Sequence, residues 1–256
     1  MKTNVLAIHA HPDDIEILAA GTLAQLAAAR HNITIVTMTP GDCGSDHHSQ
    51  EEIAAIRRSE AARSAGRIGA RYLCGEFRDM SIFSDDASRR RVTEILRQVA
   101  AGLVLTASPI DYLCDHEATS QLVRDACFAA IIPNYATGAA NAAQPLLEIP
   151  HLYFMDPIGG VDREGHTVLP DFFVNVAPQM ETKTAMLAEH ASQREWLLRH
   201  HGLDNYLETM KAWTSESGRR GGVEYAEGFR HYKGHPYPES PLLEQLLGAA
   251  VVRPQP

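Results

Sequence analysis

Hydrophobic positions in the first half of the chain follow two alternating patterns. Continuous apolar runs rich in β-branched residues predict buried strands. Between these runs, apolar residues recur at helical spacing, and Ser49 with Glu52 forms a capping-box pattern at one helix start. The predicted strands are 4–10, 32–39, 71–75 and 103–109, and the predicted helices are 16–31, 49–69, 88–102 and 118–131. Such alternation is typical of an α/β fold with helices on both faces of a mostly parallel sheet.

The second half of the chain is less regular. Apolar runs predict strands at 150–156 and 171–176, and helical spacing predicts one long helix at 180–202. The segment 217–239, rich in glycine and aromatic residues, is interpreted as a loop that closes over a site. The alanine-rich segment 134–145 is interpreted as a flexible excursion.

No sharp change of composition divides the chain. We therefore expect a single domain over residues 1–256. Within it, residues 1–132 are expected to form a Rossmann-like core, a three-layer sandwich, and residues 133–256 to complete the sheet and the pocket.

Polar residues crowd at the ends of two predicted strands. "HPDD" (11–14) follows the first strand and "DYLCDHE" (111–117) follows the fourth. In sheets of this kind, ligands bind beyond the carboxyl ends of the strands, where the strand order reverses, and the first and fourth strands are typically neighbours there. The two loops are therefore expected to face each other.

These two loops contain the residue types of a hydrolytic metal site. Such a site needs three protein ligands, an open position for water and a nearby base. Two adjacent aspartates point in different directions, so one can bind metal while the other takes a proton from water. Each of these residues also has an ordinary alternative, as a helix cap or a surface group. The residues by themselves leave both interpretations open.

Composition and charge narrow the function further. The net charge of −9, from 23 basic and 32 acidic residues, argues against a dedicated nucleic-acid binder. No apolar run is long enough for a membrane span, and the four cysteines without paired spacing fit a reducing compartment, so we expect a cytoplasmic protein. A dinucleotide-binding site is disfavoured because carboxylates occupy the place of its glycine-rich turn.

Several short segments together resemble one known family. "AHPDDIE" (10–16), followed by a helix rich in small residues, and the later "DHEAT" (115–119) are similar to motifs of the PIG-L/LmbE-like family of metal-dependent N-deacetylases. Four further segments resemble its other signatures: "GDCGS" (41–45), "IRRSE" (56–60), "LAEHASQ" (187–193) and "GGVEYAEGF" (221–229).

The resemblance implies a role for each residue of the two loops. His11, Asp14 and His116 are expected to bind the metal, and Asp13 to act as the general base that later returns a proton to the departing amine. Zinc is the metal expected from these ligand types, although histidine and carboxylate also suit iron, cobalt or manganese.

Other residues are expected around this centre. Arg57 matches the family arginine that contacts substrate, with a solvated helix face as its alternative, and Tyr225 and Glu227 are expected to border the pocket. Glu16 is expected to orient Asp13 or a ligand histidine, or else to supply only helix-start charge. Two further supporting positions are Asp115 and His190, the latter with a buried structural histidine as its alternative.

One position departs from the family pattern. Many members carry a histidine three residues before the last metal ligand, where this chain has Leu113. Leucine neither stabilises an oxyanion nor donates a proton, and losing one such group typically lowers the rate about a hundredfold to a thousandfold. Tyr112 or a histidine of the C-terminal loop is a candidate substitute; otherwise the enzyme is slow or its substrate is unusual.

The family thus predicts a hydrolase that removes an acetyl or other acyl group from an N-acylated amino sugar or a similar small molecule. The alternative is a family member that retains metal but binds a small glycoside or metabolite with little catalysis. The resemblance also implies a homo-oligomer. The acyl group and the amine that carries it are not identified by these patterns.

Overall fold

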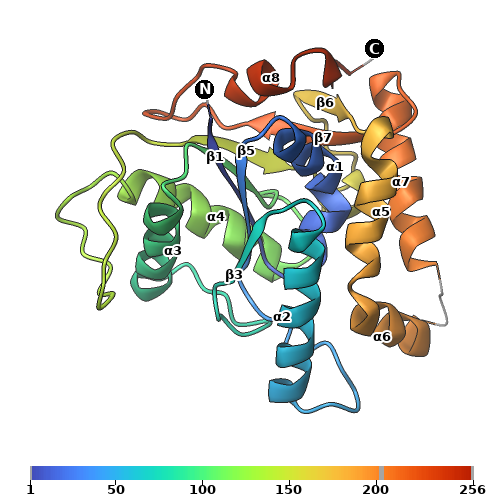
Figure 1. The fold of residues 1–256 in the computed structure, drawn as a ribbon, viewed down its shortest axis with the longest axis horizontal. Helices are drawn as coiled ribbons and strands as arrows, with labels where there is room; N and C mark the ends of the chain where they lie inside the picture. Colours follow the sequence, from blue (N-terminus) through green and yellow to red (C-terminus); the bar gives the residue numbers. More distant parts are fainter. Residues whose placement is uncertain (1, 202–204, 255–256) are drawn as a thin grey trace.

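The computed structural model describes residues 2–201 and 205–254, and these form one continuous eight-stranded sheet in the order β3-β2-β1-β4-β5-β7-β6-β8 (Figure 1). The strands are β1 (Asn4–His9), β2 (Asn32–Thr37), β3 (Arg71–Cys74), β4 (Leu103–Thr106), β5 (His151–Met155), β6 (Phe172–Asn175), β7 (Ala226–His231) and β8 (Val251–Val252). β1 to β5 pair in parallel, whereas β6, β7 and β8 pair antiparallel. The predicted α/β fold with a mostly parallel sheet is confirmed.

The predicted neighbourhood of the first and fourth strands is also confirmed. β1 pairs with β2 on one side and with β4 on the other, with Ile8 opposite Thr106. The chain runs outward from β1 through β2 to β3, and then returns to the other side at β4. The strand order therefore reverses between β1 and β4, and their carboxyl ends lie side by side.

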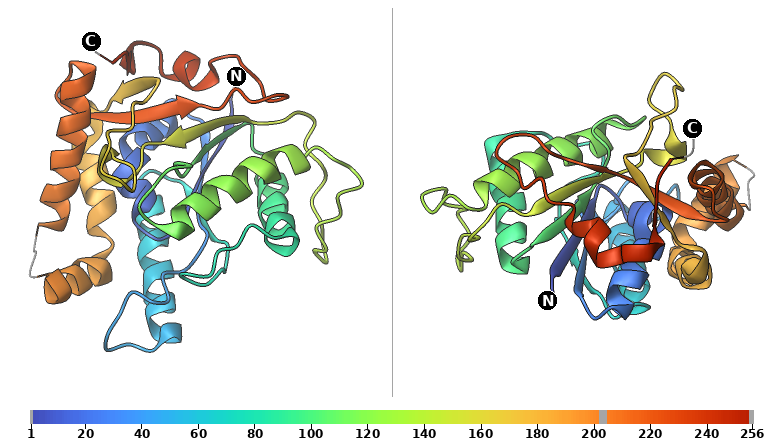
Figure 2. Two further views of the ribbon diagram at one scale, coloured as in Figure 1. Left: turned by 180° about the vertical axis from the view of Figure 1, so that it is seen from behind. Right: turned by 90° about the horizontal axis from the view of Figure 1, so that it is seen from above.

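Helices cover both faces of this sheet (Figure 2). They are α1 (Asp14–Ala28), α2 (Gln50–Gly66), α3 (Asp86–Val99), α4 (Cys114–Ala129), α5 (Met180–Ala188), α6 (Ala191–His201), α7 (Tyr206–Gly221) and α8 (Leu242–Leu247). Three single turns accompany them: η1 (Ile158–Gly160), η2 (Ala177–Gln179) and η3 (Gly248–Ala250). At the start of α2, Ser49 and Glu52 form the predicted capping box.

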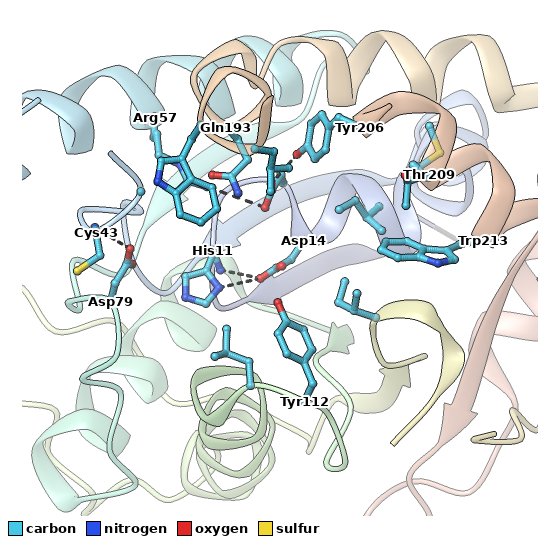
Figure 3. A pocket seen from close by; sticks show the side chains of 18 of the residues that line it. His11, Asp14, Cys43, Arg57, Asp79, Tyr112, Gln193, Tyr206, Thr209 and Trp213 are labelled. Carbon is cyan, nitrogen blue, oxygen red and sulfur yellow. Dashed lines mark hydrogen bonds and ion pairs between the residues drawn. The ribbon is translucent and has the colours of Figure 1, made fainter. Parts of the chain in front are cut away.

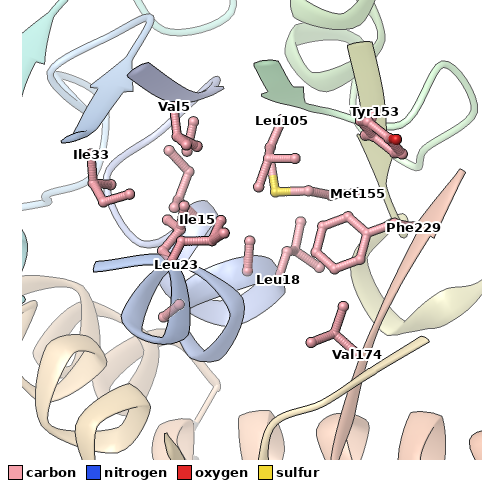
Figure 4. Packing of buried hydrophobic residues seen from close by; sticks show 14 of the residues in the cluster. Val5, Ile15, Leu18, Leu23, Ile33, Leu105, Tyr153, Met155, Val174 and Phe229 are labelled. Atoms are coloured by element: carbon pink, nitrogen blue, oxygen red, sulfur yellow. The ribbon is translucent and has the colours of Figure 1, made fainter. Parts of the chain in front are cut away.

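Alternation along β1 divides the core into two clusters. Val5 and Ala7 pack into a cluster with α1, α5 and α8, whereas Leu6 and Ile8 pack into a cluster with α3 and α4. All four side chains are fully buried, as expected when successive residues of a central strand point to opposite, covered faces. Figure 4 shows the first cluster, in which Ile15 and Leu23 of α1 lie beneath the sheet. Burial on both faces holds β1 in a fixed register, and this fixes where its end lies.

Helix α4 begins earlier than the sequence predicts. Its first residue is Cys114, so Asp115 and His116 lie in its first turn and not in the preceding loop. Acidic residues in a first turn favour the helix because they face its free amide groups and the positive end of its dipole. The early start places His116 on a helix and not on a loop, which gives it a rigid support.

Two predictions for the second half are wrong. The long helix predicted at 180–202 is interrupted between α5 and α6, while its predicted end at Gly202 lies outside the described residues. The predicted loop at 217–239 instead contains the end of α7 and the whole of β7, an internal strand of the sheet. Gly228, which suggested a loop, is required within β7 because a Cβ there would come 2.1 Å from Oδ2 of Asp156.

The segment 133–150 is a long irregular part of the chain and contains no helix or strand. It includes the predicted excursion at 134–145 and is tied to α3, where Glu94 accepts a hydrogen bond from the hydroxyl of Thr137 at 2.6 Å. None of the helices within 2–201 and 205–254 combines the length and apolar character needed to cross a membrane.

Candidate metal centre

The turn between β1 and α1 presents two adjacent aspartates in different directions. Asp13 has a left-handed backbone with φ of 102°, and its side chain makes no capping hydrogen bond to α1. The next residue, Asp14, turns back toward the strand, where its Oδ2 accepts a hydrogen bond from the backbone N–H of His11 at 2.8 Å. A non-glycine residue with positive φ is strained, and such strain is frequent at functional sites. The simple capping alternative does not describe Asp13.

Asp14 lies at the centre of a buried group of metal-binding side chains. His9, Asp14 and His116 each offer one ligand atom, and these atoms all lie within 4.8 Å of one another. His9 comes from the last position of β1 and His116 from the first turn of α4. The two loops predicted to face each other do meet.

His11 reaches the same carboxylate from the opposite side. Its Nδ1 lies 3.4 Å from Oδ2 of Asp14, and its Nε2 lies 3.3 Å from Oδ2 of Asp115. The Asp115 oxygen is held in turn by the backbone N–H of Met80 at 2.7 Å. Asp115 therefore holds the His11 ring in place, and its role as a support of a metal ligand stays a prediction.

His116 is held in the same manner. Its Nε2 lies 3.4 Å from Oδ2 of Asp14, and its Nδ1 lies 3.1 Å from Oδ1 of Asp111, which is fully buried. A carboxylate behind a metal-binding imidazole sets the tautomer and directs the other ring nitrogen at the ion. Both His11 and His116 have this arrangement.

The distances distinguish His11 from His9 as a ligand. Two zinc bonds of about 2.0–2.2 Å at the tetrahedral angle place their ligand atoms about 3.3 Å apart. The separations of 3.4 Å from Asp14 to His11 and to His116 match this value. His9 Nδ1 lies only 2.7 Å from the same oxygen, which is a hydrogen-bond distance.

Unpartnered atoms support a metal between these residues. Among the described residues, the buried Nε2 of His116 has no hydrogen-bond partner, which suits an atom that faces an ion. The buried Nε2 of His9 lacks one as well, so it is the distances to Asp14, and not the unpartnered atoms, that separate His9 from His116. The residues present therefore fit a divalent cation held by His11, Asp14 and His116. This ligand set stays a prediction. The alternative set has His9 in place of His11.

The electrostatics of the group favour positive charge. Burial opposes ionisation of Asp14, yet the nearby His116 and His9 and a hydrogen bond with His11 hold its pKa well below the usual range. Burial lowers the pKa of His11, but hydrogen bonds to Asp115 and Asp14 outweigh it and raise that pKa to about 10. A bound divalent cation would replace the protons that these histidines otherwise carry.

Asp13 stands beside this group in a different environment. Burial raises its pKa to about 6, against the opposing charge of Arg57, whose Nη2 lies 4.0 Å from its Oδ1. The hydroxyl of Tyr206 donates a hydrogen bond of 2.5 Å to its Oδ2. A carboxylate whose pKa is near neutrality is suited to accept and return a proton.

Arg57 is seated against the loop that follows β2. Its Nη2 donates to the carbonyl of Pro12 at 2.9 Å, so it also supports the turn that carries Asp13. A Cβ at Gly41 would lie 2.6 Å from its guanidinium, and one at Gly44 would lie 2.4 Å away. These glycines of the "GDCGS" segment leave the space that Arg57 fills. The side chain is buried, which excludes the solvated-helix alternative.

Glu16 and His190 contact each other behind Asp13. Nε2 of His190 lies 3.1 Å from Oε1 of Glu16, which also accepts a hydrogen bond from the hydroxyl of Ser64 at 2.6 Å. Both residues are buried, and the positive charge of His190 is among the influences that lower the pKa of Asp13. They connect α1 to α2 and to the break between α5 and α6.

A cavity of about 440 Å³ opens above the metal-binding group (Figure 3). The side chains of His11, Asp13 and Asp14 lie in its wall, together with Arg57 and Tyr206. The other lining residues are Ile17, Cys43, Gly44, Asp79, Met80, Tyr112, Leu113, Ile158, Gln193, Trp196, Leu197, Asn205, Thr209, Met210 and Trp213. Leu113, at the position where many family members carry a histidine, lines this cavity, and so does its neighbour Tyr112.

Two predicted pocket residues lie elsewhere. Both oxygens of Glu227 are occupied away from this cavity, where they accept the backbone N–H groups of Gly21 and Thr22 at 2.9 and 2.8 Å and contact the ammonium of Lys183 at 2.6 Å. Tyr225 packs against the core and is absent from the cavity wall. This differs from the prediction because β7, read as a loop in the sequence, is an internal strand at this point.

Sequence reasoning missed other residues of the site. His9 was visible in the same stretch as His11, two positions earlier, and its place at the end of a buried strand was the available signal. Tyr206 and the wall residues of α6 and α7 gave no signal, because nothing local connects them to a loop almost two hundred residues earlier.

The chain is similar to known proteins over most of its length. A family described as PIG-L, GlcNAc-PI de-N-acetylase, matches residues 6–127. A diacetylchitobiose deacetylase of Thermococcus kodakarensis is 27% identical over 239 residues, covering 90% of this chain and 83% of that protein. The segment 6–127 that matches the family includes every proposed metal ligand and Asp13.

Solved structures show the same fold. An N,N'-diacetylchitobiose deacetylase from Pyrococcus horikoshii superposes with a TM-score of 0.75 at 26% identity, covering 93% of this chain and 88% of that one. A 4-carboxy-2-hydroxymuconate hydratase from Pseudomonas putida also gives a TM-score of 0.75, at 21% identity, with coverage of 94% and 98%. The second likeness, at lower identity, is one of fold alone.

Proposed function

The chain belongs to the PIG-L/LmbE family of deacetylases, and on that premise we propose that it is a metal-dependent hydrolase that removes the acetyl group from an N-acetylated amino sugar. The observation that carries the proposal is that His11 and His116 each approach one oxygen of Asp14 at 3.4 Å, within a buried group that also includes His9, while a separate carboxylate, Asp13, lies on the wall of the same cavity. Metal-assisted hydrolysis of an amide uses both parts, a cation and a separate base.

The residues proposed to hold the metal are His11, Asp14 and His116. Zinc is the proposed ion because nitrogen and oxygen ligands in a three-residue set are typical of catalytic zinc sites. When bound, such an ion lowers the pKa of a water molecule and polarises a carbonyl group. Asp115 and Asp111 keep the ligand histidines directed at one point.

Asp13 is proposed as the general base. It accepts a proton from the water that attacks the amide carbon, and it then donates this proton to the nitrogen as the carbon–nitrogen bond breaks. The products are acetate and a free amine. Tyr206 fixes one oxygen of Asp13 by its hydrogen bond, and Arg57 supplies a positive charge near the other. The pKa of about 6 leaves Asp13 largely ionised at neutral pH yet basic enough to take the proton.

The substrate class rests on the relatives. Both deacetylases named above act, by their names, on diacetylchitobiose, a sugar with N-acetyl groups. A carboxylate base beside a metal suits any N-acyl group, so the sugar portion is the part of the proposal that the relatives alone support. The cytoplasmic location and the homo-oligomer stay predictions.

The test is release of free amine from a panel of N-acetylated amino sugars, including N-acetylglucosamine and N,N'-diacetylchitobiose. We expect the zinc-loaded protein to release amine and acetate in equal amounts, and a chelator to stop the reaction until zinc is restored. Tight binding of these sugars without amine release would support the binding alternative that Leu113 suggested. If the protein neither binds these sugars nor releases amine from them, the proposed substrate class is wrong.

A further inference from the structure

The cavity above the metal-binding group has two unlike ends (Figure 3). Arg57, Cys43 and Asp79 lie at one end, and Trp213 lies at the other, with His11 and Asp14 between them. The first end contains charged groups, Arg57 and Asp79, and Oδ2 of Asp79 accepts the backbone N–H of Cys43 at 2.9 Å. A substrate whose amide sits at the metal would therefore extend toward one or both of these ends.

The end near Trp213 is built from apolar side chains of three separate elements. Ile17 comes from α1, Ile158 from η1, and Met210 and Trp213 from α7. The indole of Trp213 lies against η1, because a Cβ at Gly159 would come 3.8 Å from its Nε1. Three elements distant in sequence thus converge on one apolar surface.

This surface is partly open to the cavity. Trp213 remains 37% exposed, and Tyr112, which also lines the cavity, remains 64% exposed, whereas Met210 is buried. Large apolar side chains that are left partly exposed around a concave site mark a ligand-binding surface. The pattern indicates an occupant that covers them.

A bare amino sugar is a poor match for this end. Sugar hydroxyl groups that lose water without gaining a partner carry a penalty of about 1–3 kcal/mol each. Thr209 offers a hydroxyl nearby, but Ile17, Ile158 and Met210 offer no strong hydrogen-bonding group. A hydrocarbon group, in contrast, gains from contact with all of them.

We propose that the substrate carries an apolar group, alkyl or aryl, joined to its N-acylated amine, and that this group occupies the end formed by Ile17, Ile158, Met210 and Trp213. The proposal rests on the deacetylase function proposed above and specifies its substrate as amphipathic. The apolar group has two possible sources, the acyl chain itself or an aglycone on the sugar.

Three matched substrates test this inference: N-acetylglucosamine, N-hexanoylglucosamine and hexyl N-acetylglucosaminide. Each buried methylene contributes about 0.8 kcal/mol, or about fourfold in kcat/KM. We expect one of the two hexyl-bearing compounds to exceed N-acetylglucosamine by at least about tenfold in kcat/KM, and the better one identifies the source. Equal or faster turnover of N-acetylglucosamine than of both would overturn the inference while leaving the deacetylase function intact.

Binding measurements keep the two proposals separate. Calorimetry with the zinc-loaded Asp13→Asn variant, in which turnover is suppressed, gives Kd for the same three compounds. Tighter binding of a hexyl compound, with no amine release by the wild-type protein, would support the apolar site and count against the deacetylase function. Equal Kd values for all three, together with equal kcat/KM values, would remove the apolar site.

Variants locate the effect at this end of the cavity. Trp213→Ser is expected to reduce the advantage of the preferred hexyl compound over N-acetylglucosamine at least about fivefold. The control is Phe128→Ser on α4, a 42% exposed aromatic residue away from the cavity, which should keep the wild-type ratio. If Trp213→Ser fails to fold, Ile158→Thr in the short turn η1 tests the same surface. An unchanged ratio in a folded variant would contradict the assignment.

Discussion

Nδ1 of His9 lies 2.7 Å from Oδ2 of Asp14, and both residues are buried. Burial lowers the pKa of His9. In the tautomer protonated at Nδ1 the ring donates to the carboxylate, and in the other tautomer Nδ1 accepts the backbone N–H of Ala10 at 2.9 Å. In the first tautomer His9 orients Asp14 from behind, while His11 approaches the same oxygen from the cavity side.

This relationship predicts different metal contents for two histidine variants. His11→Gln is expected to lose stoichiometric zinc on dialysis because a ligand is removed. His9→Gln should retain about one zinc per chain with an affinity about 10–100-fold weaker, as is usual when a hydrogen-bonded support of a ligand is lost. Elemental analysis after dialysis checks both. The reverse result would make His9 the ligand.

Asp13→Asn is expected to separate metal binding from turnover. The amide keeps the size of the side chain but cannot accept the proton, so kcat should fall by about 10²–10⁴-fold. Zinc content should stay unchanged, because the proposed ligands are untouched. Steady-state amine release and elemental analysis of the same preparation measure both quantities. A variant with wild-type turnover would exclude Asp13 as the base.

Tyr206→Phe is expected to lower kcat and to leave KM nearly unchanged. The lost hydroxyl donates to the charged Asp13, and a hydrogen bond to a charged group contributes about 1.5–3 kcal/mol, roughly 10–150-fold if all of it acts in the transition state. Tyr112→Phe is the matched comparison, since Tyr112 faces the cavity beside His116 with ring centroids 5.5 Å apart. A larger loss in Tyr112→Phe would assign the missing histidine's role to Tyr112.

Asp156 is expected to make folding stability depend on pH. Burial raises its pKa to about 6 despite Arg220 and Arg230 nearby, whereas the unfolded chain has a value of about 3.8. The folded state therefore binds the extra proton between these values, and the free energy of unfolding falls as pH rises from about 4 to about 6. At pH 7 the raised pKa of Asp156 lowers the free energy of unfolding by about 3 kcal/mol relative to its value below pH 4.

Asp156→Asn should remove this part of the pH dependence. Urea unfolding of the metal-free protein at pH 4.5 and pH 7.5 gives the free energy of unfolding for both forms. The variant is expected to gain stability relative to the wild type at the higher pH. If the difference between the two proteins is the same at both pH values, Asp156 ionises normally in the folded state.

Lys183 and Glu227 form a buried ion pair, and we expect the folded state to be destabilised when only one of the two is removed. Lys183→Met leaves Glu227 as an unpaired buried charge beside α1, and breaking such a pair typically lowers the free energy of unfolding by about 3–5 kcal/mol. Adding Glu227→Gln should restore part of this loss. Denaturant unfolding of the single and double variants measures the coupling. No recovery in the double variant would show that the loss comes from packing alone.

The first half of the fold could be predicted because its signals are local. Apolar runs identified β1 to β4, the capping box at Ser49 identified the start of α2, and the expected reversal of strand order brought residues 11–14 next to 115–116. The strand β7 was missed because Gly228 reads as a loop signal. The position requires glycine because Asp156 lies against it, and Asp156 is seventy-two positions earlier in the chain.

For the site, the sequence predicted a location. The two loops that contain Asp13, Asp14 and His116 were expected at one edge of the sheet because they follow strand ends, where the fold concentrates ligands, and the roles of these residues stay predictions from the family resemblance. Tyr206 was not found, because its contact with Asp13 depends on how α7 packs, a relationship without local signal. Glu227 was misassigned because a charged residue in a supposed loop is expected to face solvent or ligand, whereas Glu227 pairs with Lys183 in the interior.

Helix α7 takes part in both halves of the cavity. Its first residue, Tyr206, donates a hydrogen bond to the proposed base Asp13, and Trp213, two turns further along the same helix, lines the apolar end. Exchanging α7 between homologues would therefore alter substrate choice and the setting of the base together. In this architecture a new specificity brings with it an adjustment of the catalytic apparatus.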